Sequence, residues 1–198
     1  MNGMRTVSFF GRAVPVAALV SLLVAWFPPL AMAETTNWRR YSDAERGFVL
    51  EYPDTTHPEK VSALATNLVA GVAFSFQQTF QKGPDGGTLR FRFQVSVWQN
   101  TNHLSSEEWA KQNTNPQLTT NIRKMLVAGR EGTTLRTSNL AWQSVKAFVA
   151  EKDWMYELSY DDVVANTLLS EATRTDWSAL FKRMTDSFKL LSEGNGPK

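Results

Sequence analysis

Residues 68–98 read LVAGVAFSFQQTFQKGPDGGTLRFRFQVSVW and carry the strongest structural signal in the chain. Apolar residues recur at every second position on both sides of the segment Gly83–Gly87. They are Leu68, Ala70, Val72, Phe74, Phe76 and Phe80 before it, and Leu89, Phe91, Phe93, Val95 and Val97 after it. A period of two is that of a β-strand with one buried face, and the glycines and proline between the runs suit a chain reversal. The pattern predicts a long antiparallel hairpin.

A second hairpin is predicted further along the chain by the same alternation. Val145–Val149 alternates up to a polar Glu151-Lys152-Asp153 segment, and Trp154–Tyr160 alternates back. Two shorter strands are expected at Phe48–Tyr52, before Pro53, and at Lys124–Ala128, before Gly129.

Helices are expected between and after these strands. Ser105 and Glu108 have the spacing of a capping box, and Leu104 is placed to contact Trp109, so a short helix is predicted from Ser105. A longer amphipathic helix is predicted after Thr175, as its N-cap. Its apolar positions are Trp177, Leu180, Phe181, Met184 and Phe188. A weaker helical pattern lies between Lys60 and Asn67. Together the elements predict an α+β fold, an antiparallel β-sheet flanked by helices in an α/β/α sandwich.

The first 33 residues have the order of a secretory signal peptide. Arg5 and Arg12 precede an uncharged run from Ala13 to Trp26, and Ala31-Met32-Ala33 offers small residues at both positions that a signal peptidase reads. Cleavage is expected between Ala33 and Glu34. An uncleaved anchor is the alternative, but Pro28-Pro29 interrupts the run before it reaches the length of a membrane span. The prediction is a cleaved peptide at 1–33, one domain at 34–193 and a disordered tail at 194–198.

The charge and the cysteine content limit the cellular compartment and the classes of partner that the sequence allows. The chain has 21 basic and 19 acidic residues, and Arg5 and Arg12 belong to the signal, so the mature chain has 19 of each. A neutral exported domain is not expected to bind nucleic acid. Because there is no cysteine, disulfides, thiolate metal sites and a lipobox are excluded. We expect a periplasmic or secreted protein that meets a membrane only through export or an uncleaved signal.

Four segments, in this order and spacing, together with Tyr41, suggest a family. They are Gly47–Pro53, Leu104–Ala110, Ala128–Gly132 and Met184–Lys189. The set resembles the PsbP superfamily, which includes DcrB-like periplasmic proteins of bacteria. The resemblance implies an α/β/α sandwich that acts by binding or assembly, with no catalytic residues to transfer. This chain lacks the lipidation cysteine of the DcrB-like pattern.

The residues that carry the resemblance are expected to be structural. Gly47 and Gly129 suit tight turns beside strands, and Pro53 suits the end of an edge strand. Phe48, Tyr52, Ser187 and Phe188 complete this motif, with Phe188 on the buried stripe of the last helix.

One surface patch is the candidate interaction site. Arg90, Arg92, Gln94 and Trp98 share the polar parity of the second strand of the long hairpin, so they should lie on one sheet face. If Trp98 is exposed, the four residues form a patch for a protein or glycan partner. A covering helix would bury Trp98 instead, and this is the expected case because large aromatics on a sheet face are usually packed.

No residue pattern indicates catalysis, a metal or a cofactor. His57 and His103 are the only histidines in the sequence, and they have no recognised ligand spacing. No nucleophile motif is present, and the adjacent pairs Glu107-Glu108 and Asp161-Asp162 do not by themselves form a catalytic carboxylate pair.

The function expected from the sequence is therefore non-enzymatic binding or assembly, with another extracytoplasmic or membrane protein as partner. The alternative is a small-ligand or cell-wall glycan binder, which would expose Trp98, Trp142 or Trp154 along a groove. An enzyme with an unrecognised active site is the third interpretation.

Overall fold

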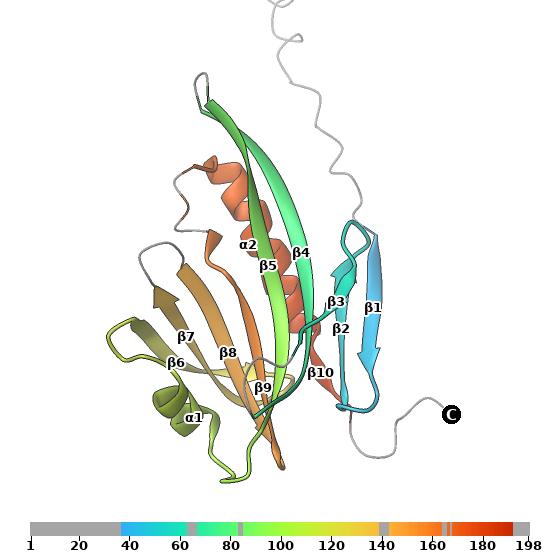
Figure 1. Cartoon of the computed structure of the whole chain (residues 1–198), viewed down its shortest axis with the longest axis vertical. Helices are drawn as coiled ribbons and strands as arrows, with labels where there is room; N and C mark the ends of the chain where they lie inside the picture. The colour runs from blue at the N-terminus through green and yellow to red at the C-terminus, as the bar shows by residue number, and fades with distance from the viewer. Residues whose placement is uncertain are drawn as a thin grey trace, which may run out of the picture. The chain divides into compact units, whose positions relative to one another are not determined.

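The computed structural model describes residues 37–62, 67–82, 85–138, 143–163, 166 and 168–191 (Figure 1). Several predictions fall outside these residues and stay predictions. They are the signal peptide with Ala31, Ala33 and Glu34, the tail 194–198, Trp142, and part of the weak helix between Lys60 and Asn67.

Seven antiparallel strands form the main sheet, in the order β3-β4-β5-β9-β8-β7-β6. Their bounds are β3 Pro58–Lys60, β4 Leu68–Lys82, β5 Asp85–Gln99, β6 Thr119–Val127, β7 Arg130–Ser138, β8 Gln143–Glu151 and β9 Trp154–Asp161. Both predicted hairpins are confirmed: β4 pairs with β5, and β8 pairs with β9. Lys60 lies in strand β3, so the weak helical pattern is wrong at its first residue, where β3 pairs with β4.

The turn of the long hairpin is shorter than predicted. Strand β5 begins at Asp85, which pairs with Lys82, so Gly86 and Gly87 belong to the strand. A Cβ atom on Gly87 would lie 2.9 Å from the ring of Phe80, its partner on β4. Glycine here lets the Phe80 ring pack directly over the backbone, and a larger residue would require that ring to move aside.

A second, three-stranded sheet has the order β1-β2-β10 and consists of β1 Trp38–Asp43, β2 Phe48–Pro53 and β10 Lys189–Leu190. The sequence patterns predict only β2 of these three. Gly47 has φ +69°, and its carbonyl accepts a hydrogen bond from Leu191 N (2.7 Å). Pro53 is the last residue of β2, opposite Trp38, so the prediction that it ends a strand is confirmed, but β2 is the central strand of this sheet and not an edge strand.

The two helices differ in how well their limits are predicted. Helix α1, Ser106–Asn113, begins at the expected capping box of Ser105 and Glu108. Helix α2, Glu171–Ser187, begins before the predicted start, because Ser170 is the N-cap and its Oγ accepts from Thr173 N. Thr175 lies inside the helix, where its hydroxyl donates to the Glu171 carbonyl (2.9 Å). Phe188 follows the helix as its C-cap.

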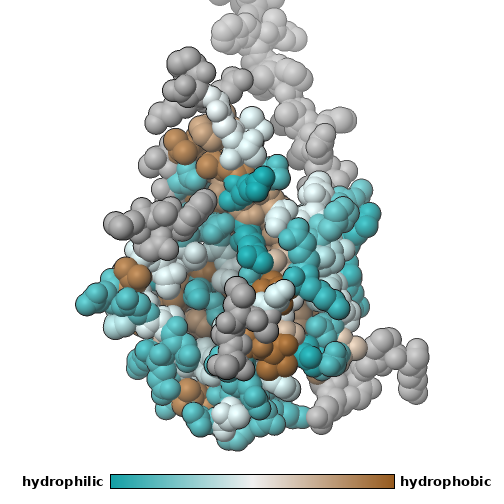
Figure 2. Space-filling model, in the orientation of Figure 1, coloured by the Kyte–Doolittle hydropathy of each residue, from teal (hydrophilic) through white to brown (hydrophobic). Residues whose placement is uncertain are grey.

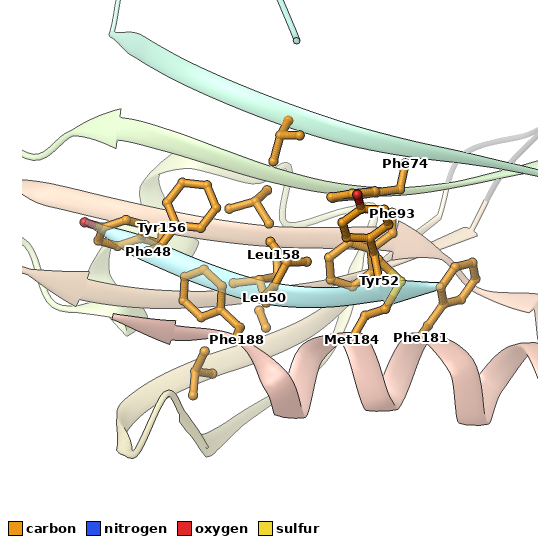
Figure 3. Close-up of a cluster of buried hydrophobic side chains, with 14 of the residues drawn as sticks. Phe48, Leu50, Tyr52, Phe74, Phe93, Tyr156, Leu158, Phe181, Met184 and Phe188 are labelled. Carbon is orange, nitrogen blue, oxygen red and sulfur yellow. The ribbon is translucent and has the colours of Figure 1, made fainter. Parts of the chain in front are cut away.

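The main sheet has two unlike faces. We call the side with Phe74, Phe93 and Leu158 the inner face; α2 and the three-stranded sheet pack on it. Figure 3 shows Phe181, Met184 and Phe188 directed from α2 and its end toward Phe93, Leu158 and Leu50. The opposite side is the outer face, and α1 covers part of it over β7 and β8. This is an α+β fold with helices on both sides of antiparallel sheet, as predicted.

The residues on which the sequence resemblance rests occupy structural positions. Phe48, Tyr52 and Phe188 are buried in the inner-face core. The Ser187 hydroxyl accepts from Glu51 N (2.9 Å) and so ties α2 to β2. Gly129 has φ +76° in the turn that joins β6 to β7, where most residues would be strained.

Candidate functional site

The predicted patch lies along one strand, on the outer face. Arg90, Arg92, Gln94 and Trp98 occupy alternate positions of β5, and Ser75 and Gln77 of β4 lie opposite Arg92 and Arg90. Arg90 and Arg92 are exposed, whereas Gln94 and Trp98 are half-buried. Figure 2 shows this side of the molecule, over which hydrophilic residues are spread with smaller hydrophobic areas among them.

Trp98 is partly covered by the first helix. Its ring lies 6.4 Å from that of Trp109, a buried residue of α1, measured between ring centroids. The indole nitrogen donates a hydrogen bond to Glu157 Oε2 (3.1 Å). The expected burial of Trp98 by a helix is thus confirmed in part, and the indole N–H is already used within the protein.

Glu157 on β9 is the centre of a polar cluster that the sequence patterns did not identify. It is buried, with 7% of its surface exposed, and its Oε1 lies 2.6 Å from Lys146 Nζ on the neighbouring strand β8. Phe148 is opposite Glu157, and Met155 is buried beside them. A buried carboxylate needs such partners, because an unpaired charge in this environment is strongly unfavourable.

A signal for this cluster was present in the sequence. Glu157 interrupts the apolar run Met155–Leu158 at the parity of the polar face, and Lys146 has the matching parity on the preceding strand. Two opposite charges at the same parity of a predicted hairpin indicate a cross-strand pair.

At its Arg92 end, the patch is bordered by Asp161, the last residue of β9. Its Oδ2 accepts a hydrogen bond from Arg92 N (2.9 Å). Burial raises the pKa of the Asp161 carboxyl, and the hydrogen bond from Arg92 N opposes that rise. The side chains of Arg90 and Arg92 form no salt bridge with any residue in the described part of the chain.

The remaining candidate residues are dispersed. His57 and His103 are exposed, and His103 faces Asp153 at 3.6 Å between Nδ1 and Oδ1. Within the described ranges, no group of three or more His, Cys, Asp or Glu residues could hold a metal. Trp154 is half-buried against the inner-face core, on the side of the sheet opposite to Trp98.

The acidic pairs serve local structure. The pKa of Glu108 is lowered by its hydrogen bonds with Ser105, and that of Glu107 by its hydrogen bond with Lys111. Asp162 approaches Arg136, with 3.1 Å between Oδ2 and Nε, whereas Asp161 binds Arg92 N. The two neighbouring aspartates therefore have separate partners and do not form a catalytic pair.

Three hollows lined by described residues lie away from the patch. One of about 350 Å³ is bounded by β2 and the end of α2, with Arg40, Glu51, Arg183 and Lys189 in its lining. Another of about 370 Å³ lies between the β6–β7 turn and the same end of α2. A third, of about 500 Å³, follows one side of α2 from Glu171 to Lys182.

Among the described residues, the helices are too short or too polar to span a bilayer.

The sheets and the helices on either side define a PsbP-like α+β domain. The protein is similar in structure to the cyanobacterial PsbP (CyanoP) from Synechocystis sp. PCC 6803, whose solution structure matches with a TM-score of 0.52. The match covers 81% of this chain and 96% of CyanoP at 12% sequence identity, so it shows the fold alone. No protein-family model and no curated protein matches the sequence.

Proposed function

We propose that this chain is exported, and that its mature domain is a non-enzymatic accessory or assembly domain of the PsbP/DcrB-like type. Its partner would be another extracytoplasmic or membrane protein. The observation that carries the proposal is the pair of exposed arginines, Arg90 and Arg92, on an outer face that α1 covers only in part.

The chemistry of this pair favours an acidic protein surface. Residues two apart on a strand project from the same face, about 7 Å from each other. Arg92 is attracted electrostatically to Asp161, but neither guanidinium forms a salt bridge with a described residue, so both can bind carboxylates of a partner without replacing a direct internal pair. Such charges steer association and set orientation more than they add affinity.

The ionisable groups support binding rather than catalysis. Among the described residues, the carboxylates whose pKa is shifted lie on two elements: Glu107 and Glu108 belong to the first turn of α1, and Asp161 ends β9. An active site would instead bring perturbed groups together in one concave pocket.

The aromatic residues give less support to a glycan site. Trp98 and Trp154 lie on opposite faces of the sheet and cannot line one groove. The Trp98 indole nitrogen also already donates to Glu157. Export is supported by the basic start, apolar run and Ala31-Met32-Ala33 of the first 33 residues.

A capture experiment tests the proposal. The mature protein, residues 34–198, is immobilised and exposed to an extracytoplasmic extract, beside an R90E/R92E variant and an R39E/R123E variant. Arg39 and Arg123 are exposed on other strands, so the second variant makes the same change in charge elsewhere. We expect R90E/R92E to reduce recovery of a protein by about tenfold or more, and R39E/R123E to leave it unchanged.

Stability is measured in parallel, because surface substitutions of this kind change the free energy of unfolding by less than about 0.5 kcal/mol. If both variants recover the protein equally, the outer face is not the binding surface. If nothing is recovered while a cell-wall glycan raises the melting temperature, the domain is a glycan binder instead.

A further inference from the structure

The long hairpin of β4 and β5 extends beyond the end of β9, the strand that pairs with β5 on its other side. Strand β5 pairs with β4 up to Asp85, but its pairing with β9 stops at Phe93, opposite Tyr160. Figure 1 shows the upper parts of β4 and β5 rising past the ends of β8 and β9. Over residues 86–91, no strand of the described ranges pairs with the edge of β5 that faces β9 lower down, and we call this the open edge.

Three hydrogen bonds fix the direction of the backbone groups of β5. Gln99 N donates toward the β4 side, to Asn67 O, whereas Asn100 N and Arg92 N donate toward the β9 side, to Asp153 O and Asp161 Oδ2. Successive residues of a strand point their N–H and C=O groups to opposite sides. The N–H and C=O groups of Gly86, Thr88 and Arg90 consequently point to the open edge.

These edge groups are accessible. Gly86, Thr88 and Arg90 are all exposed, and their backbone groups on this edge have no hydrogen-bond partner in the described ranges. Helix α2 covers the inner face here through the contact of Trp177 with Phe91, at 5.3 Å between ring centroids. That contact covers the inner face of the hairpin and does not involve the backbone groups of the β5 edge.

An open edge has two contrasting explanations. Exposed strand edges pair readily with other extended chains, and proteins often place charged residues on them to prevent this. Arg90 and Arg92 could thus be protective. However, both arginines project from the outer face beside the unpaired backbone groups, where they would meet the side chains of an added strand. A cationic row beside free strand groups is complementary to an extended acidic segment.

We propose that the β5 edge at Gly86–Arg90 binds an extended acidic peptide segment of a partner protein by strand addition. The added strand would lie in line with β9, beyond Asp161. Its acidic side chains would face Arg90 and lie diagonally across from Arg92 on the outer face, and its apolar side chains would lie on the inner side, next to Leu89. This inference rests on the proposed binding function and names the partner's chemistry and mode of contact.

Synthetic peptides test the edge directly. The probe is a labelled peptide of about eight residues that alternates Glu and Val, and the control alternates Lys and Val. We expect the Glu–Val peptide to bind the mature protein at least tenfold more tightly, by fluorescence anisotropy. Amide hydrogen exchange at Thr88 and Arg90 should slow on binding, because their N–H groups become hydrogen-bonded.

Two variants at one position separate strand pairing from charge. Thr88→Pro removes the outward N–H, which β4 does not use, and should abolish peptide binding. Because edge strands tolerate proline where the N–H faces solvent, the hairpin itself should be retained. Thr88→Val keeps the N–H and should bind as the unchanged protein does. Amide spectra of both variants confirm that the fold is retained.

The outcomes distinguish this inference from the proposed function. Absence of binding by either peptide, with no change in exchange, means that the arginines only protect the edge, and it overturns the inference. A captured partner lost in R90E/R92E but retained in Thr88→Pro also overturns strand addition, while the proposed function stands. Peptide binding with slowed exchange, but no captured protein, supports the edge site and contradicts the proposed function.

Discussion

The two faces of the seven-stranded sheet use the same strands for different purposes. The inner face is built from closely packed aromatic residues, among them Phe74 and Phe93, which are fully buried under α2 and the small sheet. The outer face combines an apolar area under α1 with the Glu157–Lys146 pair and the exposed arginines of β5. We therefore expect the inner face to supply most of the stability, and substitutions of the exposed arginines on the outer face to have little effect on folding.

The largest effect that tests this contrast is expected on the inner face. Phe93 is fully buried and its ring lies 6.0 to 6.5 Å from those of Tyr160, Phe181 and Phe74, between centroids. Phe93→Ala should lower the free energy of unfolding by about 3–5 kcal/mol, because it leaves a cavity in a packed cluster. Urea unfolding followed by tryptophan fluorescence measures the loss. Phe93→Leu is the control and should cost less; equal losses would show that volume does not govern this face.

A smaller effect is expected at the polar cluster of the outer face. Glu157→Ala removes the acceptor of the Trp98 indole N–H and the partner of Lys146. We expect the free energy of unfolding to fall by about 2 kcal/mol. Water can hydrate the Lys146 ammonium in the variant, whereas the half-buried indole N–H of Trp98 loses its acceptor. Glu157→Gln keeps an acceptor for Trp98 and should cost about half as much. A loss from Glu157→Ala as large as that of Phe93→Ala would remove the distinction between the faces.

The smallest effect is expected in the pH dependence of stability, and it involves the hydroxyl group of Tyr156 on the inner face. Burial raises the pKa of Tyr156 to about 12, with Glu151 adding to the rise, and its hydroxyl donates to the Arg46 carbonyl (2.7 Å). Because the folded state holds this proton more tightly than the unfolded state, its contribution is complete below about pH 10 and is lost between about pH 10 and 12.

Tyr156→Phe tests that contribution. The variant should lose about 1 kcal/mol near neutral pH, where the hydrogen bond is absent. Between about pH 10 and 12 its stability should fall less steeply than that of the unchanged protein, as measured by urea unfolding at several pH values. Parallel curves for the two proteins would show that Tyr156 does not titrate on unfolding in this range.

The sequence correctly predicted the helices and strands that are defined by a pattern of neighbouring residues. The alternation of residues 68–98 gave both strands of the hairpin, and Ser105 with Glu108 gave the start of α1. The same approach misplaced the start of α2, since Thr175 and Ser170 are both plausible N-caps and only the backbone geometry selects Ser170.

Elements defined by distant partners were not predictable in this way. Strands β1 and β10 are recognisable only by their pairing with β2, and the polar strand β7 lies between β6 and β8 with little alternation of its own. The candidate patch was predicted as a row on one face, but its buried neighbour Glu157 depends on the pairing of β5 with β9. Sequence parity indicates a face, whereas the partner strand determines what that face contacts.

The pairing of β10 with β2 also has a consequence for biosynthesis. The small sheet joins the first described strands to the last, so it cannot be completed until about residue 190 has left the ribosome. Long-range pairing of this kind delays folding until most of the chain is present. For a polypeptide that is threaded through a membrane unfolded, as the proposed export requires, such lateness keeps the nascent chain competent for translocation.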